Sequence, residues 1–169
     1  MQTKTNSLAP HPVLTQAQTN STLWVGHLHT DPNDHFAGQT FTCPAEGNLH
    51  NIQLYSAAVH AAGEMQLTLH EFDSRSRNWG PALGASSVAV QKQDHAKWLR
   101  FELPHVPLRK GASYAFRIQA SDAMIGLGEA ATGNHSPFTF GQEWSADSRN
   151  AEGQFYAYFS LAFKLELCA

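Results

Sequence analysis

The C-terminal segment from Phe155 to Leu167 alternates between two kinds of side chain, and this pattern constrains the fold most. The even positions carry Tyr, Ser, Ala, Lys and Glu, whereas the odd positions are all apolar: Phe155, Ala157, Phe159, Leu161, Phe163, Leu165 and Leu167. Side chains alternate across a strand with period two, whereas a helix would scatter the odd positions around its circumference. The segment therefore predicts one long strand with one face in a core, and the rest of the chain must supply its partners.

Size and charge restrict the classes of protein to which the chain can belong. At 169 residues and 18.6 kDa it suits one domain that buries enough surface to fold without a metal or a disulfide. A formal charge of −3 draws it neither to nucleic acid nor to anionic lipid. No apolar run is long enough to cross a bilayer, so we expect no membrane insertion.

The first twenty residues are rich in Gln, Thr, Asn, Ser and Pro. We interpret residues 1–20 as a flexible leader or an arm that wraps a sheet edge, and residues 21–169 as the single folded domain. No apolar h-region precedes Trp24, so the sequence gives no sign of a cleaved secretion signal. The residues alone leave the compartment open.

Short alternating segments separated by turn residues recur along the chain. The predicted strands before the terminal one lie at residues 22–28, 39–43, 49–59, 65–69, 87–92, 98–103 and 114–118. Residues 73–81 predict a polar loop with one tryptophan, and residues 126–141 a glycine-rich connection that contains Phe138 and Phe140. No segment shows an amphipathic helical pattern. About nine strands of this kind predict an all-β fold with two antiparallel sheets.

The order of these motifs resembles a jelly-roll β-sandwich module of bacterial surface and secreted proteins, close to galactose-binding-like and carbohydrate-binding modules. The positions that carry the resemblance are Gln39, Phe41, Gly47, Leu49, Ile52, Leu54, Gly63, Met65, Leu67, Leu69, Gly80, Pro81, Trp98, Phe101, Leu108, Gly111, Tyr114, Phe116, Ile118, Phe140, Gly141, Leu161 and Phe163. All are core apolar residues or turn residues. The resemblance implies a jelly-roll sandwich and a non-catalytic, often sugar-binding or adhesive module at the cell surface or outside the cell.

The two cysteines, Cys43 and Cys168, stand at the ends of predicted strands. They fit either a reduced compartment with two free thiols or a single bridge between paired strands. Both alternatives are open at this point.

Histidine and aspartate gather after the first predicted strand. His27 and His29 would share one strand face, and Asp31, Asp34 and His35 follow closely. Alternate histidines converge on one cation in some β-folds, so the five residues are a candidate metal site. Asp31, Asn33 and Asp34 share one turn and offer oxygen ligands for a structural Ca²⁺, the one candidate cofactor. The alternative is a surface turn with titrating histidines.

The sequence offers no assembled catalytic set. There is no Gly-x-Ser-x-Gly elbow, and the glutamates are scattered over turns and outward strand positions without a reason for any pair to face each other. We therefore expect a protein without enzymatic activity, and a small hydrolase is the last of three functional interpretations.

Aromatic residues in the predicted polar loops suggest a ligand site. An exposed ring can stack on the apolar face of a sugar while neighbouring polar groups reach its hydroxyls. The candidate ligand-binding residues are Trp79, Trp144, Arg77, Asn78, Gln142, Glu143 and Tyr156. The alternative for either tryptophan is that its ring plugs an end of the sandwich. A carbohydrate-binding module is the first interpretation. The second is a structural or assembly subunit, in which these rings pack against another protein chain or a second copy in a homo-oligomer.

Overall fold

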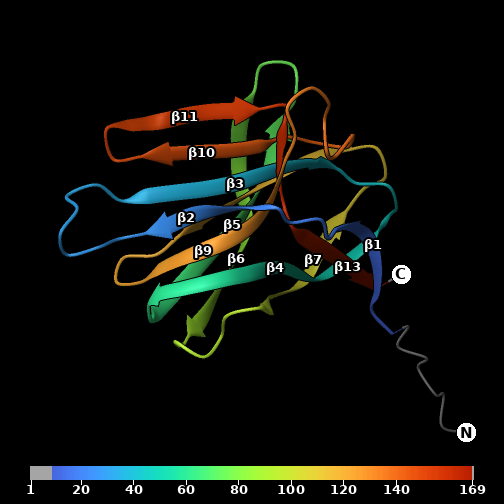
Figure 1. The fold of residues 1–169 in the computed structure, drawn as a ribbon. Coiled ribbons are helices and arrows are strands. Elements are labelled where there is room, and N and C mark those ends of the chain that lie inside the picture. Colours follow the sequence, from blue (N-terminus) through green and yellow to red (C-terminus); the bar gives the residue numbers. More distant parts are fainter. Residues whose placement is uncertain (1–8, 169) are drawn as a thin grey trace, which may run out of the picture.

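The computed structural model describes residues 9–168, and within this range it consists of strands and connecting turns (Figure 1). The strands are β1 (His11–Gln16), β2 (Ser21–Gly26), β3 (His35–Thr42), β4 (Gly47–Ala61), β5 (Gly63–Asp73), β6 (Asn78–Val90), β7 (Lys97–Leu108), β8 (Ser113–Gln119), β9 (Met124–Ala131), β10 (Glu143–Asp147), β11 (Asn150–Tyr156), β12 (Phe159–Leu161) and β13 (Phe163–Cys168). Over residues 9–168 there is no helix with the length and apolar character that a membrane crossing requires.

The strands form two antiparallel layers. One layer contains β1, β13, β4 and β7, together with β12, β9 and β2; the other runs β11, β10, β3, β8, β5, β6. A single pair, Gly26 with His35, joins β2 to β3 and thus one layer to the other. At the opposite margin β6 packs against β7. A Cβ added to Gly84 of β6 would stand only 3.2 Å from the side chains of Leu103 and Val106 in β7. The predicted all-β sandwich is confirmed, with thirteen strands among the described residues instead of about nine.

Period-two alternation sets which side chains enter the core, as the sequence predicts. Met65, Leu67 and Leu69 of β5 are fully buried, and the residues between them are exposed or half-buried. Opposite layers meet through aromatic side chains: Phe163 of β13 lies 6.2 Å from Phe41 of β3, measured between ring centroids. Such buried apolar surface is the main stabilising contribution to a fold of this kind.

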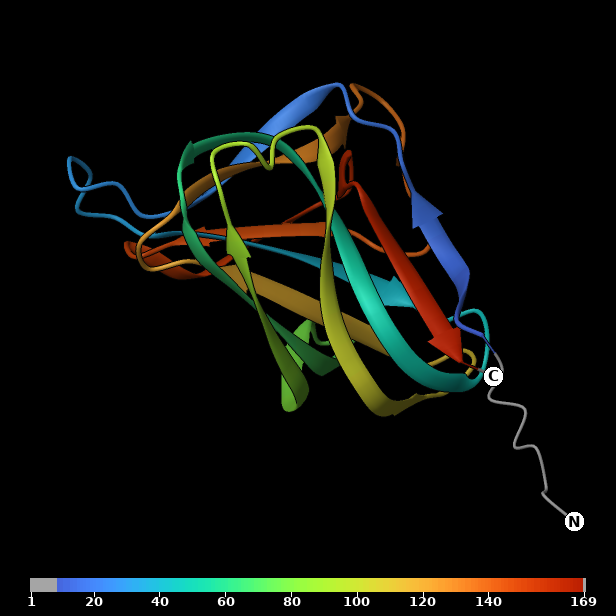
Figure 2. The ribbon, with the colours of Figure 1, turned by 90° about the horizontal axis from the view of Figure 1, so that it is seen from below.

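The terminal segment is not one strand, so that prediction is wrong in detail. Residues 157–158 form a turn, β12 pairs with β9, and β13 pairs with β4 on one side and β1 on the other (Figure 2). Ala162 marks the change of partner, because its N–H donates to the Gly128 carbonyl and its carbonyl accepts from Tyr55 N–H. The strands β4 and β9 diverge here, and the C-terminal segment fills the gap between them.

The glycine-rich stretch is likewise different from its prediction. Residues 124–131 form the buried strand β9, with β2 on one edge and β4 on the other. Gly126 and Gly128 leave room for neighbouring side chains: a Cβ on Gly126 would stand 2.5 Å from Thr22, and one on Gly128 would stand 2.9 Å from Tyr55. Glycine here permits close packing within a sheet.

The N-terminal residues that the structure describes also correct the predicted domain boundary. The predicted leader spans residues 1–20, of which residues 1–8 lie outside the described residues. His11–Gln16 form β1, which pairs with β13 at the edge of its layer. Leu14 is buried there, so this part of the leader belongs to the folded domain.

Both cysteines are free thiols. Cys43 is buried, and its thiol donates to the Ala45 carbonyl at 3.1 Å. Burial raises the pKa of Cys43 above its ordinary value. Of the two alternatives that the sequence left open, the structure has the unbridged one.

Candidate functional site

The β5–β6 hairpin places a rigid polar turn at one end of the sandwich. The carboxylate of Asp73 accepts hydrogen bonds from the backbone N–H groups of Arg75 at 3.0 Å and Ser76 at 3.3 Å. These donors hold the pKa of Asp73 below its ordinary value, with that of Ser76 the stronger influence. Arg77 closes the turn with a φ of 57°, in the left-handed region. The turn is thus fixed by its own side chains.

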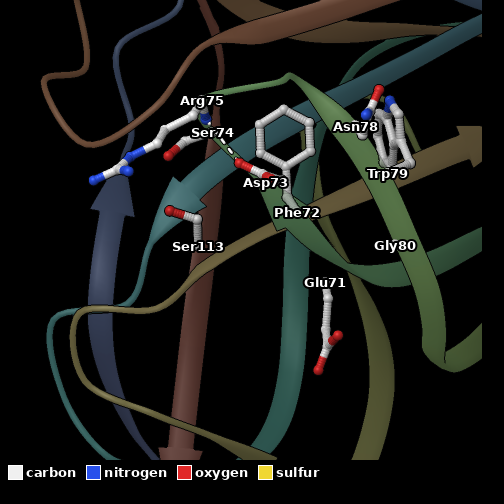
Figure 3. A pocket seen from close by; sticks show the side chains of 9 residues that line it. All are labelled: Glu71, Phe72, Asp73, Ser74, Arg75, Asn78, Trp79, Gly80 and Ser113. Atoms are coloured by element: carbon white, nitrogen blue, oxygen red, sulfur yellow. Dashed lines mark hydrogen bonds between the residues drawn. The ribbon is translucent and has the colours of Figure 1, made fainter.

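Two adjoining depressions flank this turn, and Figure 3 shows the first of them. Their volumes are about 480 and about 500 Å³, and they share Phe72, Ser74 and Ser113. We call the two together the hairpin groove. Its lining residues are Thr40, Phe41, Thr42, Glu71, Phe72, Asp73, Ser74, Arg75, Arg77, Asn78, Trp79, Gly80, Ser113, Ser136, Phe138, Thr139, Phe140, Gly141, Gln142, Phe155 and Ala157.

The second depression combines aromatic rings with uncharged polar groups. Phe140 is 52% exposed, which is the highest exposure among the large apolar residues described. Phe72 and Phe155 lie 5.5 Å apart between ring centroids, and the guanidinium of Arg77 stands 5.7 Å from the Phe155 centroid. Hydroxyl and amide side chains line the same depression. Apolar faces with interspersed hydrogen-bonding groups are what a sugar ring requires.

The structure brings together four of the seven predicted ligand-binding residues. Arg77 and Gln142 line the second depression, whereas Asn78 and Trp79 line the first. Tyr156 lies elsewhere, in a smaller depression with Trp24 and Phe36, and its ring packs 5.6 Å from Phe159.

Neither predicted tryptophan is an exposed loop residue. Trp144 lies in β10, is 2% exposed, and its indole N–H donates to the Glu152 carbonyl at 2.9 Å. Trp79 lies in β6, half-buried, with its ring 5.2 Å from that of Trp144 and 5.4 Å from that of His70. The prediction of two stacking platforms is wrong for Trp144, and only part of Trp79 reaches the groove.

The prediction that Glu143 binds a ligand is also wrong. Its side chain is 2% exposed and lies inside the sandwich beside Glu129, which is 5% exposed. Burial, together with the hydrogen bond and negative charge of Glu129, raises the pKa of Glu143 far above its ordinary value. The Oε1 atom of Glu143 has no hydrogen-bond partner. A carboxyl group in this position has no access to a ligand in the groove.

Phe72, Phe155 and Ser113 complete the groove walls, although the sequence pattern did not indicate them. Phe155 was assigned to the core face of the terminal strand, yet it lies in β11 beyond the turn at residues 157–158. Phe72 is the penultimate residue of β5, and its position is out of phase with the buried Met65, Leu67 and Leu69. A signal for these residues would have required knowledge of which strands lie side by side.

The histidine and aspartate cluster does not form the expected metal site. β2 ends at Gly26, so His27 and His29 lie in a loop, with their rings edge to face at 6.2 Å. His27 Nδ1 lies 2.7 Å from Asp34, and His35 Nε2 lies 2.9 Å from Asp31. Across residues 9–168, no three His, Cys, Asp or Glu side chains are placed to hold one metal ion.

These hydrogen bonds stabilise a surface turn instead. The His35 hydrogen bond, followed by that of the Asn33 backbone N–H, holds the pKa of Asp31 below its ordinary value. The Asp31 oxygens that a cation would need are therefore already engaged in hydrogen bonds within the turn.

Comparison with known proteins bears on the fold. No protein-family model and no curated protein matches the chain. A solved structure of the Clostridial cysteine protease Cwp84 after propeptide cleavage is similar, with a TM-score of 0.58 and 8% identity, over 95% of this chain and 40% of that one. A structure of the cysteine protease and lectin-like domains of Cwp84, a surface layer associated protein of Clostridium difficile, is similar with a TM-score of 0.52 and 9% identity, over 80% of this chain and 32% of that one.

This chain thus spans less than half the length of the structures that it matches. Their sequence identity is low, and the likeness is one of fold: a β-sandwich arrangement shared with part of a larger protein.

Proposed function

We propose that this protein is a non-catalytic binding module that holds a carbohydrate chain in the hairpin groove. The observation that carries the proposal is the exposed ring of Phe140 in a depression of about 500 Å³ whose lining combines aromatic rings with hydroxyl and amide groups. The likeness of fold to a protein described as having a lectin-like domain supports this interpretation. The same protein is described as surface layer associated, which supports a location at the cell surface or outside the cell.

Two features of the carboxylates support a role without catalysis. Glu129 and Glu143 are brought together by the fold, but both are buried and neither lines the groove. Glu71 and Asp73 do line the groove, but the Asp73 carboxylate is held by the N–H groups of its own turn and the Glu71 side chain points away from it (Figure 3). A glycoside hydrolase requires two carboxyl groups facing one scissile bond.

A glycan array followed by calorimetric titration of the strongest hits tests the proposal. Phe140→Ala removes the stacking ring, so we expect the affinity to fall about tenfold while the melting temperature stays unchanged. Trp24→Ala is the matched control, because Trp24 is 43% exposed but lies outside the groove. Equal loss in both variants, or none in Phe140→Ala, would contradict the proposal.

The assembly interpretation is the second candidate, and the exposed rings outside the groove favour it. Trp24 packs edge to face against His60 at 6.5 Å, and Tyr158 is 48% exposed. Multi-angle light scattering distinguishes the two functions: a defined oligomer that Trp24→Ala dissociates, together with silence toward glycans, would favour assembly.

A further inference from the structure

The guanidinium of Arg117 lies in a small pocket without an anionic partner. This pocket, which we call the Arg117 pocket, has a volume of about 240 Å³ and is lined by His70, Trp79, Arg117, Trp144, Ala151 and Glu152. The Nε atom of Arg117 is buried and has no hydrogen-bond partner. Across residues 9–168, no carboxylate stands within ion-pair distance of it.

Aromatic rings hold this guanidinium in place. Its central carbon stands 4.5 Å from the ring centroid of Phe36 and 5.6 Å from that of Trp144. Rings of this kind offset part of the cost of removing a cation from water, but they accept none of its N–H groups. Burial accordingly lowers the pKa of Arg117, although a guanidinium stays charged at any physiological pH.

The pocket is built on rigid elements. Arg117 is central in β8, with Gly38 of β3 on one side and Thr68 of β5 on the other. His70 is fixed by its two ring nitrogens, which lie 3.0 Å from the Gly80 carbonyl and 3.1 Å from Thr68 Oγ1. Arg117 therefore supplies charged donors to the pocket, and their fork geometry matches a carboxylate or a sulfate.

The Arg117 pocket also adjoins the hairpin groove, because the indole of Trp79 lines both. A glycan chain in the groove could therefore place one substituent against Arg117. We propose that the ligand is an acidic glycan whose carboxylate or sulfate pairs with Arg117. This inference rests on the proposed function and names the class of glycan.

Two charges in the chain shape the expected behaviour. Glu152 lines the same pocket and opposes an anion there. The net charge of −3 gives no general attraction to polyanions, so a preference for an acidic glycan must come from a local site.

The experiment compares polygalacturonate with its fully methyl-esterified form, which is the same chain without the charge. We expect the wild-type protein to bind the free acid at least tenfold more tightly than the methyl ester, because the carboxylate forms charge-assisted hydrogen bonds with Arg117. Arg117→Met should bind both forms equally, and Glu152→Gln should bind the acid more tightly. The matched control is Arg109→Met, which removes an equal charge from an exposed residue that lines neither the hairpin groove nor the Arg117 pocket and should leave the preference intact.

Dextran and dextran sulfate form a second matched pair that distinguishes sulfate from carboxylate as the recognised group. A readout independent of folding is the Nε–H resonance of Arg117, which should shift with galacturonate and stay unchanged with galactose. Neutral glycans that bind as well as acidic ones would overturn this inference and leave the proposed function standing. Silence toward every glycan would overturn both.

Discussion

Arg117 and the Glu129–Glu143 pair are two solutions to one problem, a charged group removed from water without an opposite charge. Arg117 points to the outer face of its layer, against aromatic rings and beside a pocket. Glu129 and Glu143 point into the sandwich, where the side chain of Gln39 is also fully buried. The outer site can take a partner from solution. The inner site has no such route, so it lowers its energy by keeping a proton.

The walls of the two sites include neighbouring residues of β10 and β3, although these residues face opposite sides of the layer. Glu143 pairs with Gln39, and Trp144 pairs with Gly38, so one residue along each strand separates the interior from the outer face. The buried Glu143 carboxyl is thus tolerated because it can keep a proton. The Arg117 guanidinium cannot lose its charge, and on the outer face it can pair with the proposed ligand.

The largest expected effect is on the pH dependence of stability, through Glu143→Gln. The unfolded carboxyl ionises near its ordinary pKa of 4.5, whereas the folded one keeps its proton to about 10. The wild-type protein therefore loses stability as the pH rises between these values, by at most about 1.4 kcal/mol per pH unit from this group. The Glu143→Gln variant should lack this loss, so its free energy of unfolding should exceed that of the wild type by more at pH 9 than at pH 5.

Urea unfolding at pH 5, 7 and 9 measures this difference. Glu152→Gln, a change at an exposed carboxylate, is the control and should follow the wild-type slope. If the free energy of unfolding of Glu143→Gln changed with pH as steeply as that of the wild type, the interior pair would hold no shared proton.

A smaller effect is expected from Gly38→Ala, which tests how the outer aromatic rings pack. An added Cβ would stand 2.6 Å from the Phe116 carbonyl oxygen, 3.1 Å from the Trp144 ring and 3.3 Å from the Trp79 ring. Backbone cannot move away cheaply, so we expect a loss of about 1–3 kcal/mol in the free energy of unfolding. Gly133→Ala, where a Cβ would meet nothing within 4 Å, should stay close to the wild type. Equal stability of both variants would contradict this packing.

The smallest effect is expected from Arg117→Met on stability. The variant loses the cation–π contacts with Phe36 and Trp144, which contribute about 0.5–2 kcal/mol, but it also removes an unpaired buried charge. These effects oppose each other, so the free energy of unfolding should change by about 1 kcal/mol or less, equally at pH 5 and pH 9. A strong loss of stability in urea unfolding would mean that Arg117 serves the fold and not a ligand.

The alternation of apolar residues determined much of this fold by itself. It placed Leu165 and Leu167 in the core and predicted the strands around Leu67, Phe101 and Phe116, because a strand must turn every second side chain to the same face. It also predicted a polar loop over residues 73–81, of which residues 74–77 form the turn of the β5–β6 hairpin, whereas residues 78–81 belong to β6. These are local properties, and the sequence contains them directly.

The tertiary structure decided which face is the interior and what lies across it. The side chains of Glu143 and Trp144 point to opposite faces, as period-two alternation requires. The carboxyl lies inside and the indole outside, and this orientation depends on Gly38 and on the partner strands. Glu129 meets Glu143, and Arg117 meets Phe36, because the fold brings together residues of different strands. Period two fixes alternation within a strand, but only the packing of the two layers fixes neighbours between strands.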